Sequence, residues 1–262
     1  ELSLQREKKW ASDAPKFSII VPLFKTPDNF LKELVSSIQA QTYLNWELCF
    51  ADGSPTDELK GLVEGFKDER ICYHFIGENL GISGNTNKAL EMATGDWIVL
   101  CDHDDLLVPN ALYEFADRIT KDPEIDSIYS DEDKIDETGK KLFEPHFKPD
   151  FNIDMLRSNN YICHLYGVRK ELVDRVGKFN SQFDGAQDYD FILRMSENSR
   201  KVGHVSKILY HWRTHINSTA ANPESKMYAF KAGAEAIKAH YARVLPNIKI
   251  KDVVNGESLG IY

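Results

Sequence analysis

The first hundred residues repeat a pattern in which a short apolar run is followed by polar residues and then by apolar positions at helical spacing. Short runs of this kind are typical of strands buried on both faces of a sheet. The runs are residues 17–24, 46–51, 71–75 and 97–101. After the first run, Leu31, Leu34 and Ile38 mark one face of a helix. The pattern predicts an α/β domain built from strand-helix units, with four parallel strands.

Polar residues or turn residues follow each predicted strand. Because the carboxyl ends of parallel strands meet at one edge of an open α/β sheet, these residues should converge on one crevice. The converging residues are Phe24, Asp52, Asn79, Gly81, Asn85 and the cluster at 102–105. Asp52 begins a D-G-S-P segment, so a plain turn is the competing interpretation of that residue.

Asp102, His103, Asp104 and Asp105 directly follow the fourth run, which places three carboxylates within four residues. Asp102 and Asp104 would point the same way in an extended segment and could grip one target. Hard divalent cations prefer carboxylate oxygen, so Mg²⁺ or Mn²⁺ is the natural counter-charge. A solvated loop that caps the helix opened by Pro109 is the alternative.

The second half of the chain carries further acidic and basic positions. A strand predicted at 126–130 ends in a triplet, 131–133, for which a solvated turn and a ligand-binding edge both remain open. Thr138 and Gly139 predict a hairpin turn, 143–151 an irregular crossing, and 161–168 another strand.

Asp188 should lie in the first turn of a helix that begins near Gln187. The helix dipole stabilises a carboxylate there, close to the mouth of a crevice, which suits a general base. An ordinary helix-start preference would explain the residue equally well. Farther on, His211, Arg213 and His215 alternate on one face of an extended segment at 207–220, which suggests an anion or a shared metal.

Composition narrows the function classes. The chain has 262 residues, with 32 Lys and Arg against 41 Asp and Glu, and no basic run that would follow a nucleic-acid backbone. No apolar run reaches the roughly 18 residues of a membrane span. The four cysteines lie in apolar contexts without a C-x-x-C pair, which favours buried thiols and a reducing cytosol. The first residue is Glu, as expected for a piece of a longer polypeptide.

Taken in order, seven blocks resemble family 2 glycosyltransferases, whose catalytic domains have the GT-A fold. The blocks are SIIVPLF, Q-x-Q-T-Y-x-N-W-E-L, ADGSPTD, ENLGISGNTNKAL, TGDWIVLCDHDD, GAQDYD and YHWRTHINST. The blocks SDEDKID, FKPDF and YHWR are similar to the branch found in bacterial polysaccharide and rhamnan-type synthases. The resemblance implies a leading helix or linker at 1–15, a GT-A domain at 16–220 with a nucleotide-sugar half (16–105) and an acceptor half (106–220), and a C-terminal helix and tail at 221–262.

The resemblance also implies roles for individual residues. Asp188 matches the catalytic base, and Asp104 matches the direct metal ligand of a D-x-D motif, with His215 as a second metal-ligand candidate. The nucleotide sugar would contact Pro22, Phe24, Asp52, Asn79, Gly81, Asn85, Asp102, His103, His211 and Arg213. Two positions depart from the family pattern, because Gln187 precedes the base where relatives carry Glu and Thr86 stands where many carry Arg.

The expected activity is metal-dependent, inverting transfer of a sugar from a UDP- or dTDP-sugar to a hydroxyl of a growing glycan, with Mn²⁺ or Mg²⁺ as cofactor. A second glycosyltransferase domain in the same polypeptide, and a cytoplasmic site at the inner face of the membrane during cell-envelope synthesis, are further expectations. A catalytically inactive domain that binds a nucleotide sugar or glycan is the alternative. A nucleotidyltransferase should show a Gly-rich, basic loop after the first strand, and PLFKTPDN is not one.

Overall fold

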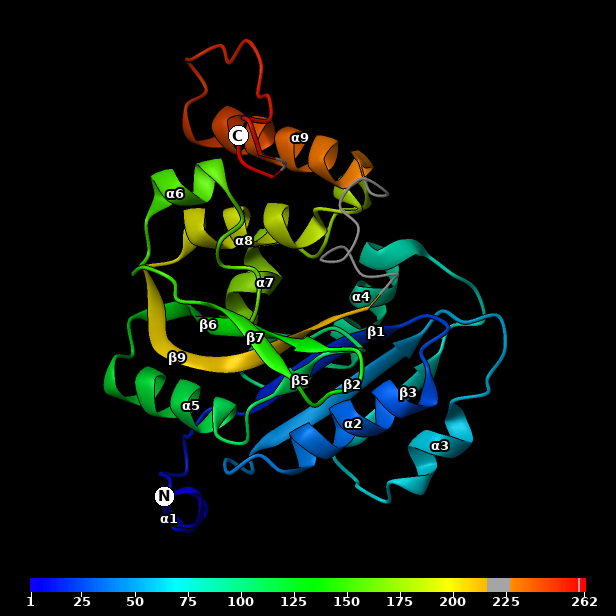
Figure 1. Cartoon of the computed structure of the whole chain (residues 1–262). Coiled ribbons are helices and arrows are strands. Elements are labelled where there is room, and N and C mark those ends of the chain that lie inside the picture. The colour runs from blue at the N-terminus through cyan, green and yellow to red at the C-terminus, as the bar shows by residue number, and fades with distance from the viewer. Residues whose placement is uncertain (216–226, 259) are drawn as a thin grey trace.

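The structure is a computed structural model of the chain, and it describes residues 1–215, 227–258 and 260–262. The boundary predicted between residues 220 and 221 lies outside the described residues. A mixed sheet runs through the molecule in the order β3-β2-β1-β4-β8-β6-β9-β5, and β7 pairs with β6. Helices cover both faces of this sheet (Figure 1).

The first half follows the predicted strand-helix pattern. Its elements are α1 (Leu2–Glu7), β1 (Phe17–Leu23), α2 (Asp28–Gln39), β2 (Trp46–Asp52), α3 (Lys60–Gly65), β3 (Ile71–Phe75), α4 (Gly81–Met92) and β4 (Trp97–Leu100). The strands β1 to β4 are parallel, and Leu23, Asp52 and Phe75 are in register at their carboxyl ends. The four predicted parallel strands and their common edge are therefore confirmed.

The second half adds strands of both directions and a helical layer. Its elements are β5 (Leu106–Leu107), α5 (Ala111–Lys121), β6 (Ile125–Asp136), β7 (Leu142–His146), α6 (Ile153–Ser158), β8 (Tyr166–Arg169), α7 (Lys170–Val176), the 3-10 helix η1 (Ser181–Phe183), α8 (Gln187–Asn198), β9 (Lys201–Thr214) and α9 (Met227–Val244). β8 runs antiparallel to both β4 and β6, and it joins the two halves into one sheet.

Two apolar cores lie on opposite faces of the sheet, because successive side chains of a strand point to opposite sides. Ile19 and Val21 pack with the apolar faces of α2 and α5, whereas Ile20 packs with α4, α7, α8 and α9. Burying one such aliphatic side chain is worth about 1.5–3 kcal/mol, so the two cores hold the carboxyl edge of the sheet firmly in place. The mixed α/β fold expected for GT-A is confirmed, and α9 stacks on α8 as the outermost helix (Figure 1).

The structure excludes one alternative that the sequence left open and corrects several expectations. The acidic triplet is not a solvated turn, because β6 continues through it and Asp131, Glu132 and Asp133 are all buried. Part of the crossing expected to be irregular at 143–151 is regular, because β7 spans Leu142–His146. The strand expected at 161–168 is shorter, and β8 begins only at Tyr166. Among the cysteines, Cys72 is exposed on the edge strand β3.

Candidate active site

Two adjoining cavities open at the carboxyl edge of β1 and β4. The first, here called the Asp104 cavity, has a volume of about 700 Å³ and is lined by Pro22, Phe24, Asp102, His103, Asp104 and His215, among others. The second, here called the Asp188 cavity, has a volume of about 430 Å³ and is lined in part by Pro22, Asp102, Glu132, Asn160, His164 and Asp188. Asp102 and Trp212 line both cavities, so ligands in the two cavities would meet beside them.

The three carboxylates of the loop after β4 have different surroundings. Asp105 is fully buried, where it accepts hydrogen bonds from the Tyr210 hydroxyl (2.5 Å) and the Arg213 backbone N–H (2.7 Å). Burial raises the pKa of the Asp105 carboxyl well above its ordinary value, and the negative charges of Asp104 and Asp102 add to the effect. Asp105 therefore anchors the loop to β9, and Asp102 and Asp104 are the carboxylates that line the cavities.

Asp104 and His215 come together although they are 111 residues apart in the sequence. The Nε2 atom of His215 lies 2.8 Å from Oδ2 of Asp104, and about one sixth of each side chain is exposed. The pair supplies one carboxylate, which suits Mg²⁺ or Mn²⁺, and one imidazole, which suits a transition metal. A second group, formed by Asp102, Asp105 and His164, offers ligand atoms within 4.8 Å of one another, but both oxygens of Asp105 already accept hydrogen bonds.

Asp188 lies in the first turn of α8, as predicted, and faces the second cavity. Its Oδ2 accepts a hydrogen bond of 2.9 Å from the Asn160 amide, which fixes the direction of the carboxylate. Burial raises the pKa of the Asp188 carboxyl above its ordinary value, although nearby His164 and the Tyr189 N–H oppose that rise. A carboxylate that is held in place and has a raised pKa is suited to accept a proton.

The loop at 159–165 carries Asn160 and His164, and a buried lysine holds it. The Lys148 ammonium group is fully buried and donates to the carbonyls of Ile162 (2.7 Å) and His164. It also pairs with Glu132 Oε2 at 3.3 Å. Burial lowers the pKa of Lys148, and the Glu132 carboxylate opposes that change. The loop carbonyls bind this ammonium instead of a neighbouring strand, which explains why β8 starts late.

His164 lies close to both Asp102 and Asp188. Its ring stacks on Tyr210 with centroids 4.8 Å apart, and its Nε2 lies 3.6 Å from Asp102 Oδ2. Sequence reasoning missed His164, Asn160 and Lys148 because none of them stands at the end of a predicted parallel strand. The FKPDF block contained the only signal for Lys148, since a cation among apolar residues and prolines has to find a buried partner.

Four of the predicted nucleotide contacts are not among the described residues that line either cavity, and each of them is hydrogen-bonded within the protein. Asp52 is buried and accepts from the Ser54 N–H (2.9 Å) and the Tyr73 hydroxyl (2.8 Å). The Asn85 amide donates to Asn79 Oδ1 (3.1 Å), which also accepts from the Gly81 N–H (3.0 Å). Gly53 has no side chain where this arrangement needs space, because a Cβ there would lie 2.5 Å from Asn85 Nδ2.

Two residues of the predicted basic strand are committed to internal acids and carbonyls. Arg213 is fully buried, donating to Glu33 Oε2 (2.5 Å), the Asp104 carbonyl (2.5 Å) and the Glu137 carbonyl (3.0 Å). His211 Nδ1 is hydrogen-bonded to the Asp133 carboxylate. Arg213 therefore fixes the backbone of the loop that carries Asp104, and neither side chain is among the described residues that line the two cavities.

Within the described ranges, none of the helices combines the length and the apolar character needed to cross a membrane.

The chain is similar in sequence to known proteins of polysaccharide synthesis. The chain is 33% identical over 235 residues to the O-antigen biosynthesis protein RfbC of Myxococcus xanthus, and 28% identical over 211 residues to a chondroitin synthase of Escherichia coli. These matches cover 88% and 79% of the chain, but only 18% and 30% of the respective relatives. The chain thus spans well under half the length of either protein.

Solved structures of TarS from S. aureus resemble this chain in fold. One, of residues 1–349, has a TM-score of 0.64 at 18% sequence identity, and the match covers 88% of this chain and 73% of that TarS fragment. The family model described as Glycosyl transferase family 2 matches residues 18–177, which is more than half of the chain. The chain therefore belongs to glycosyl transferase family 2, and the transferase class expected from its sequence is confirmed.

Proposed function

We propose that this domain catalyses metal-dependent, inverting transfer of a sugar from a nucleotide-diphosphate sugar to a hydroxyl of a growing glycan. The observation that carries the proposal is that Asp104 with His215, and Asp188 with Asn160, line two adjoining cavities that share Asp102. A donor in the Asp104 cavity would present its sugar at Asp102. An acceptor in the Asp188 cavity would approach the sugar from the opposite side.

The donor side is assigned by chemistry. Asp104 and His215 would hold Mn²⁺ or Mg²⁺, which when bound supplies positive charge for the departing diphosphate. Pro22 and Phe24 would contact the nucleoside, and Asp102 and His103 the ribose or the sugar. Asp52, Asn79, Gly81 and Asn85 keep the nucleoside pocket in shape. Arg213 and His211 act through the loop and strand that they fix.

The acceptor side follows from the position of Asp188. Its carboxylate would take the proton of an acceptor hydroxyl while that oxygen forms a bond to the anomeric carbon. The bond from that carbon to the diphosphate oxygen breaks at the same time, and its electron pair leaves with the nucleotide. One base on the face opposite the leaving group gives inversion by a single displacement, as in the inverting geometry of glycoside hydrolysis.

Substrate class and cellular setting draw on the relatives. TarS has been solved with UDP and with UDP-GlcNAc, which favours a UDP-sugar donor over a dTDP-sugar here. O-antigen biosynthesis and chondroitin synthesis are named for the relatives, which favours polysaccharide or cell-envelope glycan as acceptor. We place the protein in the cytoplasm at the inner face of the membrane, with a second glycosyltransferase domain elsewhere in its polypeptide. Within the chain we take 1–15, 16–220 and 221–262 as the leading segment, the catalytic domain and the extension.

A donor screen tests this proposal and separates an enzyme from an inactive binding domain. Thermal shift with a panel of UDP- and dTDP-sugars should reveal stabilisation that requires Mn²⁺ and disappears with a chelator, because a ligand that binds only the folded state raises its stability. Release of nucleotide from the best donor is then measured by chromatography. Donor binding without any release of nucleotide, whether water or a panel of glycans is offered as acceptor, would favour the inactive alternative. The absence of stabilisation by every donor would overturn the proposal.

A further inference from the structure

The Asp188 cavity has a wall that none of the predicted site residues supplies. Ala229, Phe230 and Gly233 of α9 and Gly260 and Tyr262 of the C-terminal segment line it together with Asp188. Its volume of about 430 Å³ falls in the range of small-molecule sites, about 300–1,000 Å³. The far end of the chain therefore forms part of the pocket in which the proposed base lies.

Two hydrogen bonds hold Tyr262, and a third holds Gly260 of the same segment. Its hydroxyl donates to the Phe230 carbonyl (2.8 Å), and its backbone N–H donates to the Ser158 carbonyl (2.8 Å). The Asn159 amide donates to the Gly260 carbonyl (3.1 Å). Burial raises the pKa of the Tyr262 phenol to about 12, so this hydroxyl stays protonated and remains a donor.

Gly233 provides the seat for the ring of Tyr262. A Cβ atom added at Gly233 would lie 2.1 Å from the Tyr262 hydroxyl oxygen, far inside van der Waals contact. Any other residue at this helical position therefore pushes the ring away. Glycine in a helix interior is destabilising relative to alanine, and here its missing side chain leaves room for the aromatic ring.

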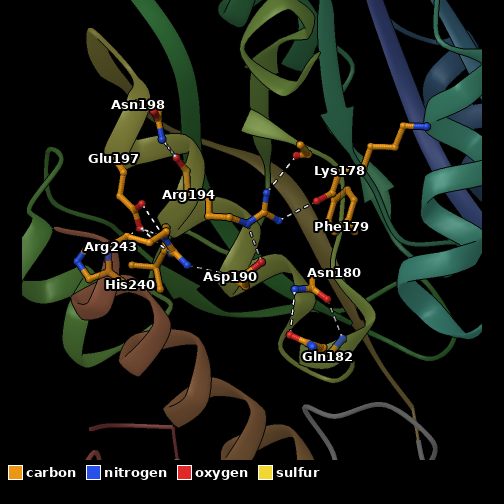
Figure 2. A network of polar contacts seen from close by, with 12 residues as sticks. Lys178, Phe179, Asn180, Gln182, Asp190, Arg194, Glu197, Asn198, His240 and Arg243 are labelled. Atoms are coloured by element: carbon orange, nitrogen blue, oxygen red, sulfur yellow. Dashed lines mark hydrogen bonds and ion pairs between the residues drawn. The ribbon is translucent and has the colours of Figure 1, made fainter. Parts of the chain in front are cut away.

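An ionic network holds α9 against α8, the helix that carries Asp188. In Figure 2, Glu197 points toward Arg243 and His240, and Asp190 faces Arg194. Glu197 Oε1 is 2.7 Å from His240 Nδ1 and 2.7 Å from Arg243 Nη2. The Arg157 side chain donates to His240 Nε2 (3.1 Å), so Nε2 is the acceptor of the ring. The ring proton is therefore on Nδ1, which donates a hydrogen bond to Glu197.

The same network ties α8 to the segment before η1. Arg194 pairs with Asp190 at 2.8 Å and donates to the carbonyls of Gly177 (3.0 Å) and Lys178 (2.8 Å). Figure 2 shows this guanidinium between Asp190 and the chain at Lys178 and Phe179. The ion pairs of Arg243 with Asp190 and Glu197 thus hold α9 against α8, the helix whose first turn carries Asp188.

We propose that Tyr262, seated on Gly233, determines the size of the acceptor sugar that reaches Asp188. This inference rests on the proposed function. The aromatic rings of Phe230 and Tyr262 would cover the C–H face of a sugar, because such rings offer apolar area next to polar atoms. The Asn160 amide and the Asp188 carboxylate would take its hydroxyls. The occupant is the terminal sugar ring of a glycan, since the pocket is continuous with Asp102 and the donor side.

The test compares two glycine-to-alanine changes in helices. Gly233→Ala displaces the Tyr262 ring, whereas Gly61→Ala in α3 places its methyl group in open space and serves as the matched control. Both changes favour helix formation, so a loss caused by Gly233→Ala alone cannot come from helix destabilisation. Tyr262→Phe removes only the hydroxyl, and Tyr262→Ala removes the whole ring.

The probes are a panel of methyl monosaccharides and methyl disaccharides, whose binding is followed by saturation-transfer NMR in the presence of UDP and the diamagnetic cation Mg²⁺. At least one monosaccharide should bind the parent with a Kd in about the millimolar range. Gly233→Ala should weaken that binding by about tenfold, and Gly61→Ala should leave it unchanged. Tyr262→Ala should admit disaccharides that the parent excludes, and Tyr262→Phe should fall between the parent and Tyr262→Ala.

UDP affinity is measured on the same samples, so failure of the inference and failure of the proposed function can be told apart. Failure of the parent protein to bind UDP would count against the proposed function. Equal glycoside binding by Gly233→Ala and Gly61→Ala would overturn the role of Tyr262 even with UDP binding intact. Displacement of the glycoside by UDP, or no glycoside binding to the parent, would overturn it as well.

Discussion

The donor side and the acceptor side of this site are built in different ways. On the donor side, Leu23 and Asp52 lie in register because neighbouring parallel strands end together. On the acceptor side, Asn160 reaches Asp188 across 28 residues, and Lys148 reaches the carbonyl of His164 across 16. A sheet edge assembles a binding crevice through backbone pairing, whereas single side-chain contacts orient the base. Substitutions on the donor side should therefore change binding, and substitutions on the acceptor side should change the rate of transfer.

The largest expected effect is on the acceptor side. Asp188→Asn keeps the size of the side chain but removes its basicity, so transfer at saturating donor should fall by a factor on the order of 100 to 10,000. Initial rates and the donor Kd are measured together on the parent and the variant. A rate within about twofold of the parent would remove Asp188 as the base, and a matching loss of donor affinity would erase the contrast between the two sides.

On the donor side, Asp104→Ala should abolish the gain in UDP affinity that Mn²⁺ provides, a loss of about 100-fold, because several kcal/mol of charge stabilisation depend on this ligand. Calorimetry with Mn²⁺ and with a chelator measures the gain. Asp104→Glu should recover part of it, and the exposed Asp13→Ala serves as control. Unchanged affinity in Mn²⁺ would contradict the assignment of Asp104 as the ligand.

A smaller effect is expected from Lys148→Met, which removes the ammonium group that holds the loop carrying Asn160 and His164. Transfer should slow by about tenfold with UDP affinity preserved, because a displacement of about 1 Å at a reacting group can cost up to about 100-fold. This change leaves Glu132 buried without its cation, so the double variant with Glu132→Gln controls for loss of stability. Recovery of the parent rate in a stable double variant would mean that charge balance matters here and loop position does not.

The smallest expected effect concerns pH. Only the deprotonated Asp188 accepts a proton, and burial raises its pKa above the usual value of about 3.9. Activity should therefore rise with pH through that raised pKa and level off above it. A profile of kcat/KM against pH measures this limb, and Asn160→Ala should move it farther upward, because the carboxylate loses a hydrogen bond to its charged form. A limb at the ordinary carboxylate pKa in the parent would contradict the buried setting of the base.

Much of the fold could be predicted from the sequence because its signals are local. The strand expected at 71–75 is found as Ile71–Phe75, and α8 begins at Gln187 as expected. Apolar periodicity and turn residues act over a few positions, so they remain readable without knowledge of the partner strands. The same holds for the carboxylates after β4, whose position follows from the end of the strand.

The acceptor side could not be predicted in the same way. Asp131, Glu132 and Asp133 are buried because they pair with histidines of β9 and β7 and with Lys148. An acidic triplet in the sequence does not reveal these distant partners. The same limit holds for one residue of the donor side, because Arg213 resembled an anion ligand and the sequence cannot indicate that Glu33 lies opposite it, 180 residues away. The sequence contained no signal for Tyr262, because its role depends on packing against Gly233, which has no side chain.

The most direct test of the central claim is the anomeric configuration of the first product, followed by NMR from the start of the reaction. A single base facing the donor across the crevice allows only one displacement, so an α-linked UDP-sugar should yield a β-configured product at the earliest time points. An α-configured first product would require a covalent or front-face route and would contradict the placement of Asp188 opposite the leaving group.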